Sequence, residues 1–462
     1  MYRKSISAIL AIGLVLSSGS AYAQQVKSAP NGHSAIAFDN KVLNKINVDN
    51  MYNTIAYLSE QPREAGTEGE VRAVKYIESQ FKSLGLETTI QPFPIYDTRV
   101  NHVIVQINGN NVAESPKPFS GSVSKKVTAP LVYIGTGLPE EIGDLTGKIA
   151  LIERGGITFI EKVQNALEKG AVGVLMYNNS SAGNSFGQVQ DGQNIPAVAI
   201  TRATGLQLVE QLKTTEVEAT LDVDIEKIEK TSYNVIASLK PNKNKDTGQI
   251  VTVGSHHDSV PGGPGANDDA SGVSAVLELA RVLSKTPIDT EIRFMTFGSE
   301  ERGMVGSSYY AASLSKDEVS RIQAHFQMDM IGGRDAGEDN PAGGLIMYTI
   351  DGKKNLVTDL GAAAGARIRS ETIPYGQLGR SDHQPFHELG IPAALFIHSP
   401  VEPWYHKPTD TLDKISKEKL QQVAEIVGAS VYQIARPDTP ALVNATVAQE
   451  LVDYPFENRP VD

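Results

Sequence analysis

The stretch QIVTVGSHHDSVPGGPGANDDASGVSAVLELARVLS, residues 249–284, decides the fold. It begins with an apolar, β-branched run, passes through a turn rich in Gly and Pro, and ends in an apolar run typical of a helix. The order predicts a buried strand, a loop and a helix. EIRFMTFGS (291–299) and AHFQMDMIG (324–332) repeat the buried-strand pattern. Strands that alternate with helices predict an α/β fold with a mixed, mostly parallel sheet covered by helices on both faces.

Polar side chains stand where the first strand ends. Side chains alternate along a strand, so His256 and Asp258 point to one face and His257 to the other. An imidazole that binds zinc commonly donates its second N–H to a carboxylate, which orients the ring. The pair His256 and Asp258 fits that arrangement, although a polar surface loop is the alternative interpretation of the triplet.

Acidic residues follow at the next two element ends. Asp268 and Asp269 stand just before the helix, where an ordinary cap is the alternative to a carboxylate that bridges two cations. Glu300 and Glu301 follow the strand in EIRFMTFGS, and ligands of open α/β sheets bind at the carboxyl ends of strands. Adjacent carboxylates repel unless cations or a proton compensate them, so a solvated acidic pair is the competing interpretation.

Two further candidates lie later in the chain. Asp329 is placed inside an apolar strand, where burial is costly unless a cation pairs with it. Tyr405 and His406 precede a turn that contains Pro, and a hydroxyl there is able to donate to an oxyanion, although packing is the plainer interpretation. Together these stretches offer nitrogen and oxygen ligands of the kind that zinc favours, including a carboxylate for sharing between two ions.

Composition excludes several classes of function. The chain has 462 residues, which favours two domains, and a net charge of -12 with no Lys/Arg-rich run. Such a surface repels phosphate backbones, so we expect no nucleic-acid partner. The chain has no cysteine, which excludes thiolate metal sites and a cysteine nucleophile.

The first residues have the pattern of a signal peptide. Arg3 and Lys4 supply the positive start, residues 6–16 a short apolar run, and Ala21-Tyr22-Ala23 the small residues that a signal peptidase needs. The pattern predicts secretion with cleavage after Ala23. A membrane anchor is the alternative, but it needs about 20 apolar residues, and no other segment is long enough to span a bilayer.

Hydrophobic patterns and local composition divide the rest of the chain into predicted segments. A capping box of Thr67 and Glu70 predicts a helix that ends at Gly85. Between 125 and 228, the runs APLVYIG, KIALIER, VGVLMYN and IPAVAI and one helix at 159–169 predict a small α/β unit. The predicted segments are an irregular extension or pro-segment (24–45), a main domain in two parts (46–124 and 229–436), the inserted unit (125–228) and a tail (437–462).

These residues make the family recognisable. The chain resembles the M28 zinc aminopeptidases, in particular the secreted, Bacillus-type double-zinc members that carry a protease-associated (PA) insert. The family pattern of H-x-D, N-D-D, E-E, a lone Asp and Y-H occurs in order. REAGTEGEVRAVKYIESQFKSLGLE resembles the family's N-terminal segment. GKIALIERGGITFIEKVQNALEKGAVGVLMYNN, with IPAVAI, resembles a PA domain, and the likeness covers roughly residues 46 to 436.

The resemblance implies roles for nine residues and two zinc ions per chain. It makes Asp268 the carboxylate shared by both ions, with His256 and Asp329 on one ion and Glu301 and His406 on the other. The remaining roles are a general base (Glu300), a partner of the His256 ring (Asp258), an oxyanion contact (Tyr405) and, through GRSDHQPF, a substrate contact (Arg380).

The implied function is hydrolysis of amino-terminal residues from peptides by zinc-activated water. From the signal-peptide pattern we expect the enzyme to be secreted, and we expect it to be a monomer. Two enzyme alternatives share the fold. Glutamate-carboxypeptidase-like proteins need a basic pocket, for which Arg380 is a thin basis, and single-zinc glutaminyl cyclases lack a full second metal set. A metal-free binding module is the third alternative, and the intact ligand set with Glu300 argues against it.

Overall fold

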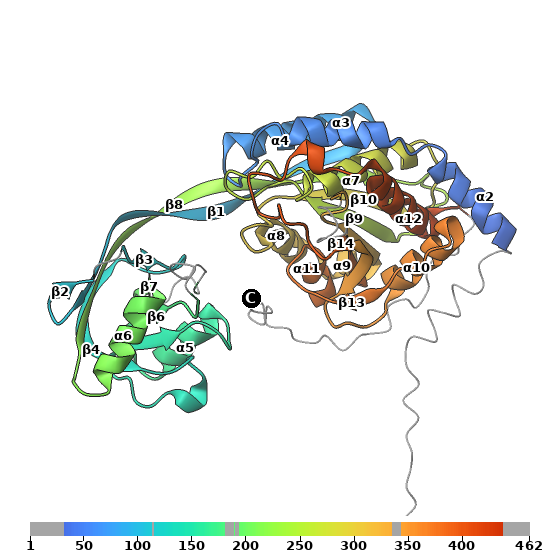
Figure 1. Cartoon of the computed structure of the whole chain (residues 1–462). Coiled ribbons are helices and arrows are strands. Elements are labelled where there is room, and N and C mark those ends of the chain that lie inside the picture. The colour runs from blue at the N-terminus through green and yellow to red at the C-terminus, as the bar shows by residue number, and fades with distance from the viewer. Residues whose placement is uncertain (1–31, 113–114, 181–188, 190–193, 335–342, 438–462) are drawn as a thin grey trace, which may run out of the picture. The chain divides into compact units, whose positions relative to one another are not determined.

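The computed structural model describes residues 32–112, 115–180, 189, 194–334 and 343–437. The chain forms two compact units, whose elements are labelled in Figure 1. The first unit comprises the described residues up to Phe93 and those from Ser232 onward, and the second runs from Pro94 to Thr231. The predicted signal peptide (1–23) and nearly all of the predicted tail lie outside the described residues, and the predicted domain boundaries stay a prediction.

The first unit is built on a mixed sheet with the order β13-β12-β14-β11-β9-β10-β8. β9 lies between β10 and β11, parallel to both, and β11 is parallel to β14, whereas β8 and β12 run antiparallel to their neighbours β10 and β14. The strands are β8 (Glu218–Leu239), β9 (Ile250–His256), β10 (Glu291–Phe297), β11 (Ile322–Met328), β12 (Gly344–Thr349), β13 (Tyr375–Gln377) and β14 (Ala393–Ser399). The predicted mixed, mostly parallel sheet is confirmed.

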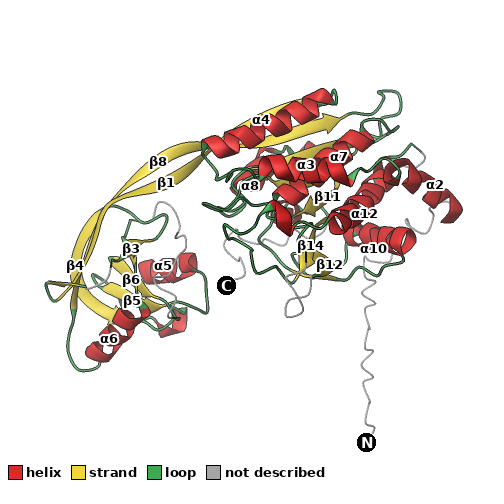
Figure 2. Ribbon diagram, turned by 45° about the horizontal axis from the view of Figure 1, so that its top comes forward, coloured by secondary structure: helices red, strands yellow, loops and turns green. Residues whose placement is uncertain are grey.

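Helices cover both faces of this sheet (Figure 2). Side chains alternate along β9, so Val251 and Val253 pack on one face and Ile250 on the other. Each buried side chain of this size contributes roughly 1.5–3 kcal/mol. One face carries α2 (Gly32–Leu43), α3 (Val48–Leu58), α4 (Glu68–Ser83), α7 (Ala270–Leu283), α10 (Leu356–Arg369) and α12 (Lys417–Ala435). The other face carries α8 (Val305–Ser313), α9 (Lys316–Arg321) and α11 (His383–Glu388).

Two local predictions at the amino end are wrong. Residues 32–43, expected to be irregular, form α2, which is held by a two-point ion pair between Asp39 and Arg367 of α10. The capping box is absent, because the Thr67 hydroxyl donates to the carbonyl of Glu64 instead of capping α4. Glu70 is fully buried, where it accepts hydrogen bonds from the backbone N–H of Gly66 and from the hydroxyl of Ser232.

The second unit contains the predicted small α/β module. Its sheet has the order β8-β4-β5-β6-β7-β3, in which β4 to β7 are parallel. Its elements are β2 (Asn110–Asn111), β3 (Lys117–Pro118), β4 (Lys125–Tyr133), η1 (Pro139–Glu141), β5 (Ile149–Glu153), α5 (Phe159–Glu168), β6 (Gly173–Tyr177), β7 (Ala197–Ile200) and α6 (Arg202–Leu212). The four predicted strands and the predicted helix are therefore confirmed. Two long strands, β1 (Glu87–Ile107) and β8, carry the chain between the units.

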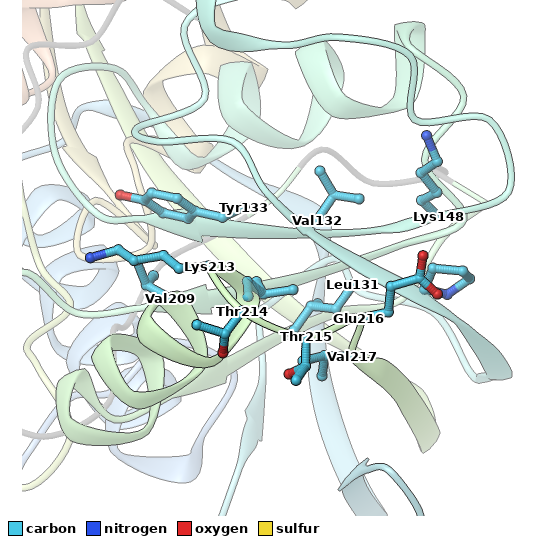
Figure 3. Close-up of a pocket in the computed structure, with 12 residues that line it drawn as sticks. Leu131, Val132, Tyr133, Lys148, Val209, Lys213, Thr214, Thr215, Glu216 and Val217 are labelled. Atoms are coloured by element: carbon cyan, nitrogen blue, oxygen red, sulfur yellow. The ribbon is translucent and has the colours of Figure 1, made fainter.

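A hollow of about 730 Å³ in the second unit lies between β4 and the segment 213–217 (Figure 3). Val132 and Val209 line it together with Lys213 and Glu216. None of the residues predicted to carry chemistry contributes to this hollow. Throughout the described ranges, every helix is too short or too polar to cross a bilayer.

Candidate metal centre

The predicted site residues meet at one edge of the first sheet. In the register of β9 and β10, His256 lies beside Phe297, so both strands end together. Glu300 and Glu301 follow β10 after two residues of loop. Asp329 was expected inside a strand, but it follows Met328, the last residue of β11. The carboxyl ends of three adjacent strands thus supply candidate ligands to one place, as open α/β sheets do.

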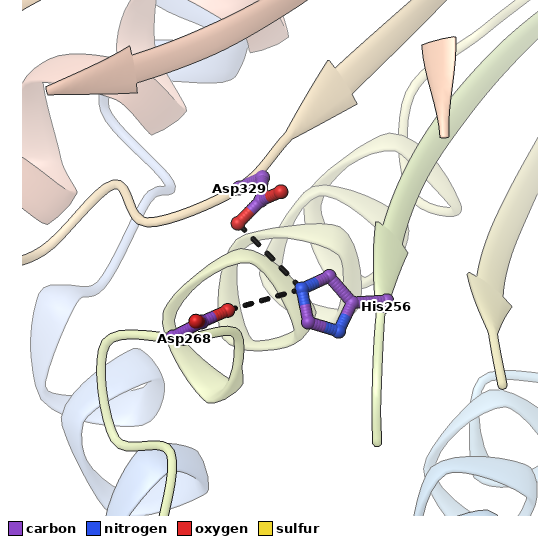
Figure 4. Close-up of side chains that lie close together, drawn as sticks. All are labelled: His256, Asp268 and Asp329. Carbon is purple, nitrogen blue, oxygen red and sulfur yellow. Dashed lines mark ion pairs between the residues drawn. The ribbon is translucent and has the colours of Figure 1, made fainter. Parts of the chain in front are cut away.

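A first group comprises His256, Asp268 and Asp329 (Figure 4). Nε2 of His256 lies 3.2 Å from Oδ1 of Asp268 and 3.6 Å from Oδ1 of Asp329. All three side chains are buried. One ligand atom from each residue lies within 4.8 Å of the others, so a single cation is able to contact all three.

A second group comprises Asp268, Glu301 and His406. Nε2 of His406 lies 3.3 Å from Oδ2 of Asp268 and 3.0 Å from Oε2 of Glu301. Asp268 thus presents one carboxylate oxygen to His256 and the other to His406. The two groups share this carboxylate, an arrangement that suits two metal ions bound close together.

The electrostatics of the site fit divalent cations. Oδ1 of Asp329 and Oε1 of Glu301 are buried and have no hydrogen-bond partner. Burial and the neighbouring Asp268 raise the pKa of Glu301 to about 7. Although burial opposes the imidazolium form, Asp268 and Glu301 raise the pKa of His406 to about 10. Buried carboxylates without compensating donors are costly, and cations bound among them would remove that cost.

Asp258 organises the loop that carries the glutamate pair. Its Oδ1 accepts a hydrogen bond of 3.0 Å from the backbone N–H of Glu300, and its Oδ2 accepts one of 3.3 Å from that of Glu301. Its Oδ1 also lies 3.5 Å from Nδ1 of His256. Asp258, which is fully buried, therefore faces both the histidine and the loop after β10.

Glu300 projects into the same cluster but belongs to neither ligand group. Its Oε2 lies 3.9 Å from Nε2 of His256. Burial raises the pKa of Glu300 well above its usual range, and the nearby carboxylates of Asp382 and Asp329 add to this effect. A carboxyl group with a raised pKa beside a group of candidate metal ligands suits proton transfer.

Tyr405 and Arg380 are both more exposed than the buried ligands His256, Asp268 and Asp329. The Tyr405 ring stacks on the His406 ring at 3.7 Å between centroids, and its side chain is 37% exposed. Burial raises the pKa of the Tyr405 hydroxyl, so it remains protonated and able to donate. Arg380 is exposed and has a left-handed backbone with φ of 69°, two residues before the helix N-cap Asp382.

Three further residues position the ligands. Asp269 caps α7 through the N–H of Gly272, and its carboxylate also accepts the backbone N–H groups of His256 and Met330. The hydroxyl of Ser381 donates to Oδ2 of Asp329 at 2.7 Å. Asp410 accepts the backbone N–H groups of Asn267 and Asp268. These residues support the ligands without belonging to either group, and outer partners of this kind tune metal affinity.

Sequence reasoning missed these three supports to different degrees. Asp269 was considered, together with Asp268, as a helix cap or a bridging carboxylate, and its contacts with the backbone of His256 and Met330 were not predicted. Ser381 lies in the GRSDHQPF run, which drew attention only to Arg380. Asp410 lies 142 residues from Asp268, and no local pattern connects the two.

Comparison with known proteins agrees with this geometry. Residues 234–431 match peptidase family M28, and residues 127–208 match the PA domain. Aminopeptidase YwaD of Bacillus subtilis is 39% identical over 404 residues, which cover 84% of this chain and 85% of the relative.

Solved structures are similar over the same range. An aminopeptidase from Aneurinibacillus sp. strain AM-1 is 52% identical with a TM-score of 0.77, covering 86% of this chain and 96% of that one. BSAP, a zinc aminopeptidase from Bacillus subtilis, is 38% identical with a TM-score of 0.65, covering 84% of this chain and 95% of that one. These comparisons confirm the predicted PA insert and the predicted class of enzyme, a hydrolase of peptide bonds. The chain belongs to peptidase family M28.

Proposed function

We propose that this peptidase is a zinc-dependent aminopeptidase that holds two zinc ions and removes residues from the free amino end of peptides. The observation that carries the proposal is Asp268, whose two carboxylate oxygens face His256 and His406 at 3.2 and 3.3 Å. The names of similar proteins, aminopeptidase YwaD and the zinc aminopeptidase BSAP, support the same activity and metal.

The donor set suits zinc. His256, Asp268 and Asp329 would hold one ion, and Asp268, Glu301 and His406 the other. Each group offers imidazole nitrogen and carboxylate oxygen, with no thiolate. Bound zinc supplies Lewis acidity, which lowers the pKa of water and polarises a scissile carbonyl.

Glu300 is the proposed general base. It lies beside the first ligand group without belonging to it, so its carboxylate is free to accept a proton from the attacking water. The same carboxyl group then donates the proton to the leaving amine. Asp258 fixes the backbone of Glu300 at its N–H, which keeps the base in place while the proton moves.

The surroundings favour a substrate with a positively charged amino end. The buried carboxylates of Asp258, Asp269 and Asp382 lie around the ligand groups in addition to Glu300. A free α-ammonium is attracted to such an excess of negative charge. Tyr405 is proposed to donate to the oxyanion of the tetrahedral intermediate, and Arg380 to contact the substrate.

The remaining sequence-based expectations stay proposals. Secretion rests on the signal-peptide pattern of residues 1–23, and the peptide substrates rest on the family. The protein is proposed to act as a monomer, with neither nucleic acid nor membrane as partner.

Zinc stoichiometry tests the metal centre. Purified protein is stripped with a chelator, dialysed against zinc and analysed for bound metal. The proposal predicts two zinc ions per chain, and Asp268→Asn should lower the occupancy at both positions because both share Asp268. A wild-type protein that binds one ion, or an Asp268→Asn variant that still binds two with unchanged affinity, would contradict the shared carboxylate.

A further inference from the structure

Arg63 is a buried cation that belongs to neither ligand group, and the proposed reaction gives it no role. It lies in the turn between α3 and α4, and its side chain is fully buried. Within the described part of the chain, its guanidinium forms no ion pair at short range and binds backbone carbonyl oxygens instead. Nε donates to His257 (2.8 Å), Nη1 to Leu58 (3.2 Å) and Pro264 (2.5 Å), and Nη2 to Gly265 (2.9 Å).

These contacts hold both ends of one loop. His257 directly follows the ligand His256, and Gly265 precedes the shared ligand Asp268 by three residues. The intervening sequence SVPGGPGA (259–266) is rich in Gly and Pro, and few of its side chains are able to hold the loop in one conformation. A glycine-rich loop has more backbone freedom to lose than other sequences, so its conformation has to be fixed from outside.

The loop is shaped to receive the guanidinium. Gly265 has a φ of +60°, and a Cβ at this position would lie 2.9 Å from Nη2 of Arg63 and 2.3 Å from the carbonyl oxygen of Asp268. A side chain at Gly265 would therefore displace the guanidinium, and it would be strained by the left-handed backbone.

Ser259 connects the backbone of Arg63 to the same loop. The N–H of Arg63 donates to Oγ of Ser259 at 2.9 Å, and the Ser259 N–H donates to the Arg63 carbonyl at 3.3 Å. The Ser259 hydroxyl donates to the carbonyl of Gly263 at 2.8 Å. Arg63 and Ser259 thus contact the loop at its beginning, middle and end.

We propose that Arg63 is a positioning residue for the metal centre: it connects the two ends of the loop 257–265 and thereby fixes Asp268 relative to His256. The inference rests on the proposed zinc centre. Lysine cannot replace this function, because its single ammonium cannot reach carbonyls at both ends of the loop as a planar guanidinium does.

The test measures zinc affinity in the full chain by competition with a chromogenic chelator. Arg63→Lys keeps the positive charge and should weaken zinc binding by about 10- to 100-fold, the range found for outer partners of metal ligands. Excess zinc should restore much of the lost peptidase activity. The matched control is Arg367→Lys, because Arg367 forms a two-point contact with Asp39 of α2 and none with the loop. It should leave zinc affinity unchanged.

Ser259→Ala keeps the inference testable if Arg63→Lys does not fold. This variant removes the hydroxyl contacts to Arg63 and Gly263, and we expect a several-fold loss of zinc affinity in a protein that folds without zinc. Folded Arg63→Lys and Ser259→Ala variants that bind zinc as the wild type does would overturn the positioning role alone. A wild-type protein that takes up no zinc would overturn the proposed metal centre, so the two failures are distinguishable.

Discussion

Asp258 and Glu300 are joined by a hydrogen bond of 3.0 Å, in which the backbone N–H of Glu300 donates to Oδ1 of Asp258. This bond connects the segment after β9 to the loop after β10, and so holds His256 and the glutamate pair at a fixed relative position. The same carboxylate accepts the N–H of Glu301. The proposed base and one proposed ligand are thus fixed by a single buried side chain.

Glu300→Gln should nearly abolish turnover while zinc stays bound. The amide fills the same space but cannot accept a proton, and general bases contribute about 10²- to 10⁴-fold to rates. Hydrolysis of a leucine-starting peptide and metal analysis of the same sample measure both properties. Glu60→Gln, at an exposed glutamate, is the control. Near-normal activity of Glu300→Gln would show that another group is the base.

Asp258→Asn should lower kcat by a larger factor than it lowers the equilibrium constant for folding. An amide has one carbonyl oxygen, so one of the two N–H groups of Glu300 and Glu301 would face an NH₂ group instead. We expect kcat to fall by about 10- to 100-fold, as for other outer partners of metal ligands. Steady-state kinetics at saturating zinc tests this, and an unchanged kcat would show that Asp258 does not position the base.

Ser381→Ala should weaken zinc binding by about 10-fold. The change removes the hydroxyl that donates to Oδ2 of Asp329 and leaves that ligand free to rotate. Chelator competition measures the effect. Ser430→Ala is the matched control, because the Ser430 hydroxyl is buried in α12 and donates only to the carbonyl of Ile426. Equal zinc affinities of the two variants would contradict the role of Ser381.

The zinc-free protein should lose stability as the pH falls below about 6.5, in part through His325. Burial, to which the ring of Phe386 stacked at 3.7 Å contributes, lowers the pKa of His325 to about 3. The unfolded chain then binds a proton that the folded chain does not. The contribution of His325 to the free energy of unfolding is therefore present above the pKa that His325 has in the unfolded chain. It is lost on acidification, by about 2 kcal/mol between pH 7 and 5.

Urea unfolding of His325→Asn at several pH values tests this contribution. The variant should be less stable at pH 7, and its stability should fall less between pH 7 and 5 than that of the wild type. Carboxylates elsewhere titrate in both proteins, so the difference between the two pH slopes isolates His325. Parallel pH slopes would show that His325 does not titrate as described.

Local patterns were enough to predict the elements that carry the site. β9, β10 and α7 begin and end close to the predicted positions, because the buried strands and the Gly-rich turn have strong local signals. The ends of β9, β10 and β11 then placed His256, Glu301 and Asp329 at one edge of the sheet, whereas Asp268 and His406 lie in turns. Asp329 was misplaced only by one residue, since a strand's last residue has no sharp signal in the sequence.

Long-range contacts explain what the sequence could not predict. Thr67 and Glu70 have the spacing of a capping box, yet the Glu70 carboxylate accepts a hydrogen bond from the hydroxyl of Ser232, which is 162 residues away in the sequence. Arg63 binds carbonyls of residues about 200 positions away. Every residue has a backbone carbonyl, so the sequence does not indicate which of them will accept from a given side chain. Such partners are known only once the fold brings them together.

The most direct test of the proposed activity is hydrolysis of one leucine-starting peptide with its amino end either free or acetylated, with and without a zinc chelator. We predict cleavage of the free form only, loss of cleavage with the chelator, and recovery when zinc is added back. Equal cleavage of both forms, or cleavage that persists after the metal is removed, would contradict a zinc aminopeptidase.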